Sequence, residues 1–215
     1  MKLSVRNEEF FLHPARVLLW PTQNLMIVAD IHLGKAQTFL KNGLWMPPQA
    51  HMNDLEILSQ VIKSQSIQRV LFLGDFIHSP EGLTPKTISE FVKWKNSLAV
   101  KLTVVIGNHD RPALKSWPKE WDFIELVDFV KINNFILQHE PPETKLAEFV
   151  WCGHLHPKVK MRFAGDELSL PAFVVTPDIG YLPAFSSLAG GAPFAIKKNN
   201  RYFVTGENSV SEIKV

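Results

Sequence analysis

Cysteine is almost missing from the 215-residue sequence, in which Cys152 stands alone. A single thiol cannot form an intrachain disulfide, so a disulfide framework is excluded and a reducing compartment fits best. Long apolar runs are missing as well, because runs such as LMIVADIHLG meet a charge within a few residues, short of the ~18 to 20 apolar residues of a membrane span. The opening MKLSVRNEEFF has Glu8 and Glu9 where a secretory signal needs an apolar core. We therefore expect a cytoplasmic protein with no membrane partner.

The sequence also lacks an excess of one charge sign. Lys and Arg number 23 against 21 Asp and Glu, which gives a formal net charge of +2. A protein that coats nucleic acid non-specifically needs a larger basic excess, so any contact with DNA must be a local patch. Hydrophobic residues make up 46% and charged residues 20%, which is typical of globular domains and excludes disorder, collagen-like repeats and a coiled coil. We expect one domain over residues 1–215.

Short apolar runs alternate with helical patterns in the first half of the chain. Residues 16–20 and 25–30, separated by a Pro-Thr-Gln-Asn turn, predict a hairpin. Apolar residues at three- and four-residue spacing predict a helix over residues 49–65, and Thr84-Pro85 predicts the N-cap of a second helix. Strand-like runs follow each helix, so we expect a βαβ sheet with helices outside it as far as Gly107.

The second half has little helical periodicity. Its Pro- and Gly-rich stretch from Pro171 to Pro193 predicts an irregular surface excursion. The rest indicates a second sheet packed on the first, which makes the fold class α/β, a mixed sandwich. Six short strand-like runs begin at Asn134, Glu148, Lys158, Leu168, Pro193 and Arg201.

Six of the eight histidines fall in or immediately after the ends of predicted strands. In α/β sheets the loops beyond the carboxyl ends of neighbouring strands converge, so we expect the polar blocks at these ends to meet in space. In chain order the blocks are DIHLGK (30–35), GDFIHS (74–79), GNHDR (107–111), QHEP (138–141) and GHLHP (153–157).

These residue types suit a metal site better than a nucleophile triad. Asp30/His32 and His154/His156 are i, i+2 pairs, and alternate residues of an extended chain point to the same side. Carboxylate and amide oxygens mixed with imidazole fit Mn²⁺, Fe or Zn²⁺ rather than Ca²⁺. The blocks hold at least seven candidate ligands, too many for one ion. Two ions bridged by a carboxylate, which we expect to be Asp75, and by a hydroxide would use them all and suit in-line attack on phosphorus.

The order D-x-H, G-D, G-N-H-D, a lone H and G-H-x-H over residues 30–156 resembles the signature of the calcineurin-like metallophosphoesterases. DIHLGK, GDFIHS, HEP, GHLHP and a later LPAF followed by GG are similar to the DNA ligase-associated metallophosphoesterase family. This resemblance implies a four-layer α/β/β/α sandwich with two packed mixed sheets. It also implies two divalent metal ions, manganese before iron or zinc. The partners it implies are DNA and a functional association with a DNA ligase, an exonuclease and a helicase in bacterial repair.

The resemblance also implies roles for several residues of the blocks. His109 would protonate the leaving oxygen or stabilise transition-state charge, with Asp110 orienting it. Apart from the resemblance, Arg111 and Lys35 directly follow site motifs, a position that suits a grip on a phosphate, although a solvated face or an ion pair explains them equally well. His78 stands where the wider superfamily usually has aspartate, which leaves open whether it touches the site or buttresses it. The implied ligands are Asp30, His32, Asp75 and His156 for the first ion, and Asp75, Asn108, His139 and His154 for the second.

We therefore expect a metal-dependent DNA phosphodiesterase or endonuclease that acts in ligase-associated repair. A small-molecule phosphatase or a cyclic or nucleotide phosphodiesterase is the alternative. A non-catalytic scaffold is disfavoured, because such a protein typically drops a ligand and every ligand is present. Lys158, Lys160 and Arg162 alternate along one predicted strand, which suits either a track for the DNA backbone or an ordinary exposed strand face.

Overall fold

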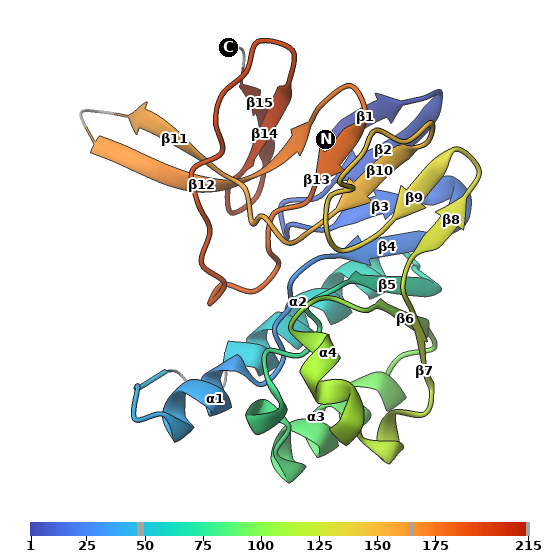
Figure 1. The fold of residues 1–215 in the computed structure, drawn as a ribbon, viewed down its shortest axis with the longest axis vertical. Coiled ribbons are helices and arrows are strands. Elements are labelled where there is room, and N and C mark those ends of the chain that lie inside the picture. Colours follow the sequence, from blue (N-terminus) through green and yellow to red (C-terminus); the bar gives the residue numbers. More distant parts are fainter. Residues whose placement is uncertain (47–49, 164–165, 214–215) are drawn as a thin grey trace.

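The computed structural model describes residues 1–46, 50–163 and 166–213, which form two mixed β-sheets packed face to face (Figure 1). The expected α/β class with two mixed sheets is confirmed. The first sheet contains, in spatial order, β1 (Lys2–Val5), β2 (Glu8–Leu12), β3 (Leu18–Trp20), β4 (Leu25–Val28), β5 (Arg69–Leu73), β6 (Lys101–Val105) and β7 (Ile124–Val127). The second contains β15 (Val210–Ile213), β14 (Arg201–Thr205), β12 (Asp166–Val175), β13 (Ile179–Tyr181), β10 (Phe149–Cys152), β9 (Phe135–Leu137) and β8 (Val130–Ile132), with β11 (Lys158–Phe163) paired to β12.

Strand pairing in the first sheet changes from antiparallel to parallel at β4, as the sequence predicts. β3 and β4 form the expected antiparallel hairpin, whereas β4, β5, β6 and β7 run parallel. Parallel neighbours need crossover segments, and the chain uses helices for them. The helix expected over residues 49–65 is α2, and Gln49 lies outside the described residues. The helices are α1 (Lys35–Lys41), α2 (Ala50–Ser64), α3 (Pro85–Asn96) and the short α4 (Asp110–Ala113).

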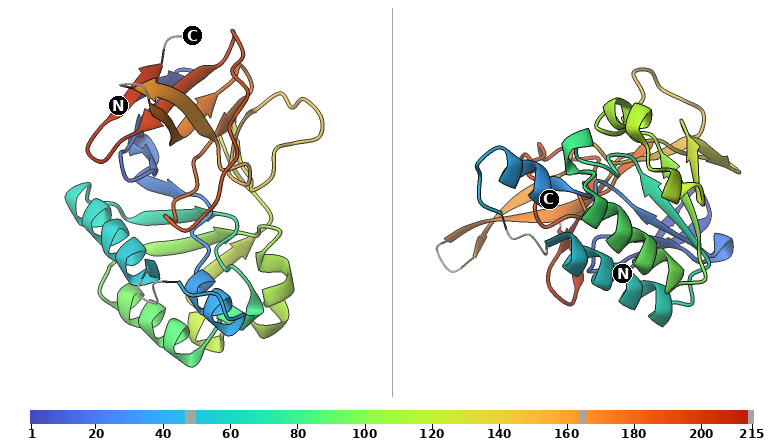
Figure 2. Two further views of the ribbon diagram at one scale, coloured as in Figure 1. Left: turned by 90° about the vertical axis from the view of Figure 1, so that its left-hand side faces the viewer. Right: turned by 90° about the horizontal axis from the view of Figure 1, so that it is seen from below.

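The helices lie on one side of the first sheet and the second sheet lies on the other, as two further views show (Figure 2). Side chains of β4 alternate between these two cores. Met26 and Val28 join the cluster that includes α2 and α3, while Ile27 joins the cluster between the sheets. β4 is therefore buried on both faces, which explains its continuous apolar run. No helix in the described ranges combines the length and hydrophobicity needed to cross a bilayer.

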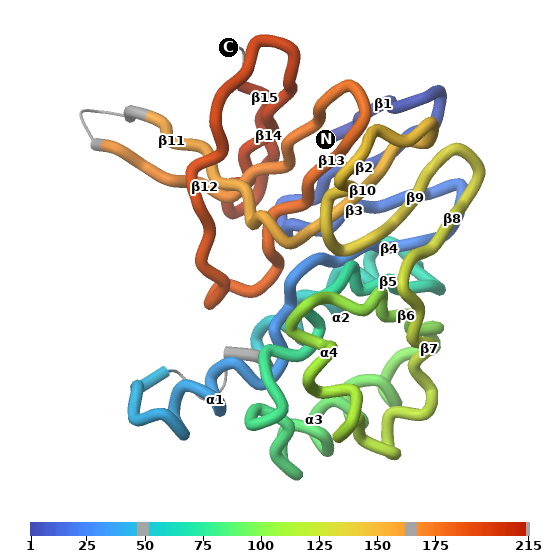
Figure 3. Tube along the Cα trace, in the orientation of Figure 1, coloured from blue at the N-terminus to red at the C-terminus, as the bar shows by residue number. Residues whose placement is uncertain are grey.

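The outer face of the second sheet differs from the implied four-layer arrangement. It carries a small buried cluster that includes Val174 and Tyr202, with Phe194 packed against it. In the part of the chain that the structure describes, no helix follows Trp121, so the fourth layer is made by chain without helix. The β11–β12 hairpin extends away from the rest of the second sheet, to the left in Figure 3.

Two expectations for the second half are wrong. Residues 193–198 do not form a strand, because their backbone bonds to the Tyr202 hydroxyl, which accepts from Lys197 N–H and donates to the Ala195 carbonyl. The stretch 171–193 is not a surface excursion, since it includes β13 and the buried Phe185, whose N–H donates to the Ala29 carbonyl at 2.8 Å.

The N-terminus of α3 offers a direct stability test. The Thr84 hydroxyl accepts a hydrogen bond from Thr87 N–H at 3.1 Å, with Pro85 at the first helical position. We predict that Thr84→Ala lowers the free energy of unfolding by about 1 kcal/mol, the usual cost of losing such a cap. Thr84→Ser keeps the acceptor oxygen and serves as the control. Urea titrations measure both, and an unchanged midpoint for Thr84→Ala would contradict the assignment.

Candidate metal centre

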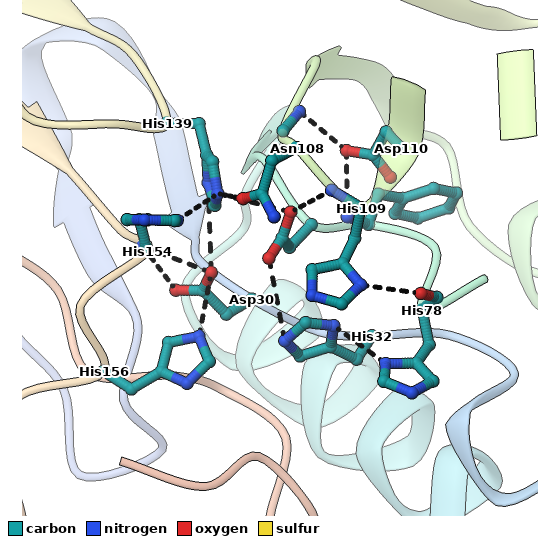
Figure 4. A network of polar contacts seen from close by, with 12 residues as sticks. Asp30, His32, His78, Asn108, His109, Asp110, His139, His154 and His156 are labelled. Carbon is teal, nitrogen blue, oxygen red and sulfur yellow. Dashed lines mark hydrogen bonds and ion pairs between the residues drawn. The ribbon is translucent and has the colours of Figure 1, made fainter. Parts of the chain in front are cut away.

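Five segments that follow strand ends meet at the junction of the two sheets. Asp30, Asp75 and Asn108 follow β4, β5 and β6 of the first sheet, and His139 and His154 follow β9 and β10 of the second. The first two segments are bonded to each other, because Asp30 N–H donates to the Gly74 carbonyl and His32 N–H to the Asp75 carbonyl. The polar side chains point toward one another in Figure 4. Convergence at the carboxyl ends of the strands is the arrangement that the sequence predicted.

The expected ligands form two groups that share one residue, and a third group joins His32 to His78 and His109. Within each group, one potential ligand atom per residue lies within 4.8 Å of all the others. Asp75 belongs to both groups, and the Asn108 side-chain oxygen lies 3.0 Å from Nε2 of His139. The first group is Asp30, His32, Asp75 and His156, and the second is Asp75, His139 and His154.

The two carboxylate oxygens of Asp75 face different groups. Oδ2 lies 3.9 Å from Nε2 of His32. Oδ1 lies 3.2 Å from Nε2 of His139 and accepts a hydrogen bond from the backbone N–H of His109 at 3.0 Å. A carboxylate placed in this way can bind two neighbouring cations at once. The geometry therefore suits Asp75 to a bridging position.

The contacts around His139 favour a cation over hydrogen bonds alone. Its Nδ1 lies 3.0 Å from the Leu73 carbonyl and donates to it, which leaves Nε2 directed into the site. Within 3.2 Å of Nε2 lie an oxygen of Asp75, the oxygen of Asn108 and Nδ1 of His154. One N–H cannot satisfy three such neighbours, whereas a divalent ion coordinates several of them together.

A buried ring nitrogen that makes no hydrogen bond in the described part of the chain marks the first group. His156 Nε2 is buried and makes no hydrogen bond within the described residues, although it lies 3.2 Å from Oδ1 of Asp30. Asp30 is 0% exposed and accepts the His154 N–H on both oxygens. A cation between Asp30 and His156 would satisfy both side chains. The residues present therefore fit divalent ions in both groups.

Burial and charge oppose each other in the pKa values of the site. Burial would raise the pKa of Asp75, but the hydrogen bond and charge of His139, the His109 N–H and the His32 charge lower it to about 2. Burial would lower the pKa of His139, but Asp75, Asp30 and the Leu73 carbonyl raise it to about 9. Burial lowers the pKa of His32 to about 3 despite the Asp75 charge. Without ions, Asp75 and His139 thus form an ion pair, and a bound ion would take the place of the His139 proton.

The backbone of five of the seven expected ligand residues has a positive φ and is therefore not extended. Residues other than glycine rarely adopt a positive φ, and here it sets the direction of each side chain. The expected alternation of an extended chain is therefore wrong for both i, i+2 pairs. Asp30 and His32 do meet in one group, whereas His154 and His156 belong to different groups. The φ angles are 55° at Asp30, 49° at His32, 48° at Asp75, 66° at His154 and 44° at His156.

Two glycines leave room for these side chains. A Cβ at Gly74 would lie 2.2 Å from the His139 ring, and a Cβ at Gly107 would lie 2.3 Å from the Asp75 backbone nitrogen. Both distances are shorter than contacts that real side chains make. The glycines of the G-D and G-N-H-D motifs are thus required by close approach to Asp75 and His139.

The partners of His109 and Asp110 differ from the expected ones. The Asp110 carboxylate does not orient the His109 ring; it accepts the N–H groups of Phe76, Ile77 and Gly107 and ties together the segments after β5 and β6. Burial raises the pKa of Asp110 to about 6, although these hydrogen bonds lower it. His109 Nδ1 instead lies 2.8 Å from the His78 carbonyl, to which it donates.

His78 touches the site through both its backbone and its ring. The ring stacks on His109 with 5.3 Å between centroids, and its Nδ1 lies 3.5 Å from Nδ1 of His32. Burial and the charges of Lys35 and His109 lower the pKa of His78 to about 4. The sequence left this position open, because a backbone carbonyl as the partner of His109 has no signal in residue types.

The basic side chains expected to bind phosphate differ in how close they lie to the ligand groups and in what they contact. Arg111 is exposed and lies 3.9 Å from Asp128, outside the two ligand groups, while Lys35 lies over the Phe39 ring near Asp75. Lys160 forms an ion pair with Glu167, and the side chain of Arg162 lies outside the described residues. Sequence reasoning missed Arg16 and Ser186, which the fold brings to a cavity beside His156.

The family described as calcineurin-like phosphoesterase matches residues 24–154, more than half of the chain. The nuclease MPE of Pseudomonas putida covers 98% of this chain and 99% of its own, with 28% sequence identity and a TM-score of 0.83. A novel archaeal phosphodiesterase is 17% identical, covers 88% of this chain and 98% of its own, and has a TM-score of 0.43. The phosphoesterase Yfce of E. coli is 15% identical, covers 88% of this chain and 97% of its own, and has a TM-score of 0.42.

No curated protein matches the chain at a significant level. The match to the Pseudomonas nuclease over nearly the whole of both chains is consistent with the resemblance to the DNA ligase-associated family. The matched region of the family contains the strands β4, β5 and β6 together with most of the ligand residues. On this evidence the chain belongs to the calcineurin-like phosphoesterase family.

Proposed function

We propose that the protein is a dinuclear metal-dependent phosphodiesterase that cuts DNA internally. The observation that carries this proposal is the position of Asp75, whose two oxygens face two separate groups of ligand atoms. Similarity to the nuclease MPE supports a nucleic acid as the substrate. Action in DNA repair beside a ligase, an exonuclease and a helicase is part of the same proposal and rests on the family resemblance.

Ion binding, proton donation and positioning of the catalytic loop fall to different residues. The two ions would be held by Asp30, His32, Asp75, Asn108, His139, His154 and His156. When bound, the ions supply Lewis acidity for the attack of water on phosphorus and offset the developing negative charge. His109, held through Nδ1 by the His78 carbonyl, protonates the leaving oxygen from its other ring nitrogen. Asp110 positions the loop of His109 by accepting backbone N–H groups from two segments.

Metal dependence is the first test of this function. Protein stripped with a chelator should lose hydrolysis of a phosphodiester model compound, and Mn²⁺ should restore it better than Mg²⁺, which prefers oxygen ligands to imidazole. Asp75→Asn should lose at least one ion, measured by elemental analysis, while Asp122→Asn, at an exposed position, should keep both. Full activity in excess chelator would refute the proposal, and two tightly held ions in Asp75→Asn would refute the bridge.

Substitutions of the neighbouring residues Asn108 and His109 should affect metal binding and turnover differently. His109→Ala should keep both ions yet lose at least ~10²-fold in kcat, with a smaller loss on substrates whose leaving group needs no proton. Asn108→Ala should weaken binding of the second ion instead, because its oxygen lies beside His139. Metal content and kcat on activated and unactivated diesters separate the two roles. A His109 variant without metals, or with wild-type turnover on poor leaving groups, would contradict this division.

Substrate preference is the third test. The candidate cations Lys35, Arg111 and Lys158 lie on separate segments, which suits an extended strand better than a small monoester dianion. We predict faster hydrolysis of diesters than monoesters and nicking of plasmid DNA with weak base specificity, since phosphate contacts carry no sequence information. DNA binding should weaken steeply with salt. Preference for monoesters with intact plasmid would favour a small-molecule phosphatase.

A further inference from the structure

A small cavity of about 80 Å³ opens beside the ligand residue His156. Four segments line it: the turn before β3, the start of β11, Pro171 of β12 and the loop after β13. They contribute Arg16, Lys158, Ser186 and Ser187. We propose that this cavity binds the phosphate next to the scissile phosphodiester of a nucleic acid strand, which makes Arg16 and Lys158 specificity-determining residues. The inference rests on the proposed function and names a subsite of it.

Arg16 is fixed at the cavity by a tight turn. His13 N–H donates to the Val17 carbonyl and Arg16 N–H donates to the His13 carbonyl, which holds Arg16 at a φ of 60°. A positive φ at a long side chain is uncommon and persists where surrounding contacts require it. Asp54, which is 3% exposed, acts electrostatically on Arg16 from the helix side, so a bound anion would share the guanidinium with it.

Lys158 reaches the cavity across a glycine. A Cβ at Gly191 would lie 2.8 Å from Cε of Lys158 and 2.6 Å from the His156 carbonyl oxygen. Backbone bonds from Lys158 N–H to the Ala192 carbonyl and from Phe194 N–H to the Lys158 carbonyl hold the two segments together. In the described ranges Lys158 forms no ion pair with a carboxylate, unlike Lys160 two residues further along β11, which pairs with Glu167.

The chemistry of the cavity fits a phosphate group. An arginine fork and a lysine ammonium recognise phosphate oxygens, and the serine hydroxyls can donate further hydrogen bonds. The Ser186 hydroxyl accepts the backbone N–H of Leu188 at 3.3 Å, and among the described residues it donates to no acceptor. A volume of about 80 Å³ admits a phosphate but not a base with its sugar. Because His156 belongs to both the cavity and the first ligand group, a phosphate here neighbours the one at the ions.

Short thymidine oligonucleotides test the subsite. The dinucleoside monophosphate TpT has one diester and no flanking phosphate, whereas pTpT and TpTp add one on either side. For wild-type protein we expect kcat/KM to be at least ~10-fold higher for one of the two flanked substrates than for TpT. Lys158→Gln and Arg16→Gln should each lower this ratio about 10-fold, whereas Lys160→Gln and Arg69→Gln should leave it unchanged. A wild-type ratio near one for both flanked substrates, or an equal loss in the controls, would overturn the inference.

A binding measurement separates this inference from the proposed function. Thymidine 3′,5′-bisphosphate should bind the metal-loaded protein more tightly than either monophosphate, and Lys158→Gln should remove the difference, as calorimetry can measure. If no diester is hydrolysed, the proposed function fails while this result still supports the subsite. Equal affinities for bisphosphate and monophosphates would reject the subsite even if diesters are cut. If Arg16→Gln lowers the melting temperature because of the burial of Arg16, Lys158→Gln carries the test.

Discussion

The rest of the centre depends on one buried carboxylate, that of Asp75. It is 2% exposed and receives contacts from three other segments: the His109 N–H, the His139 ring and the His32 ring. A buried carboxylate is costly unless partners surround it, so the segments after β4, β6 and β9 must approach it closely. This requirement explains the absence of side chains at Gly74 and Gly107. It also explains why the two sheets meet at this edge, since each supplies part of the shell around Asp75.

The packed sheets make the backbone strain of the site tolerable. A residue held in a sparsely populated backbone region costs of order 1 kcal/mol or more, and several ligand residues are left-handed. Hydrogen bonds between the segments after β4 and β5 oppose this cost, and the bridge between Leu33 and Ile77 continues the parallel pairing beyond the strands. Asp110 adds bonds from its buried side chain to the segments after β5 and β6. The segments that carry the ligands are therefore held by hydrogen bonds that continue the pairing of β4 and β5 beyond the ends of these strands.

Sequence patterns revealed the parts of this molecule that depend on local rules. The apolar runs that became β4, β5 and β6, the cap at Thr84 and the order of the polar blocks each depend on periodicity or on a motif. Errors arose where distant contacts decide the outcome. Phe185 lies in a Pro- and Gly-rich stretch but is buried through its bond to Ala29, and residues 193–198 bond to the Tyr202 hydroxyl instead of pairing as a strand. Asp110 follows His109 in sequence, yet its carboxylate is directed to the backbone of another segment.

Charge balance at the centre connects ion binding with the stability of the fold. Asp30 and Asp75 are both almost fully buried. In the ion-free protein the negative charge of Asp75 is offset mainly by the positive charge of His139, whose pKa is raised to about 9. Divalent ions would replace that proton and would also satisfy the nitrogen of His156 that has no hydrogen bond within the described residues. Because the unfolded chain does not hold these ligands together, the free energy of ion binding adds to the stability of the folded state. The same closeness of ligands that makes the ion-free centre costly thus stabilises the fold once the ions are bound.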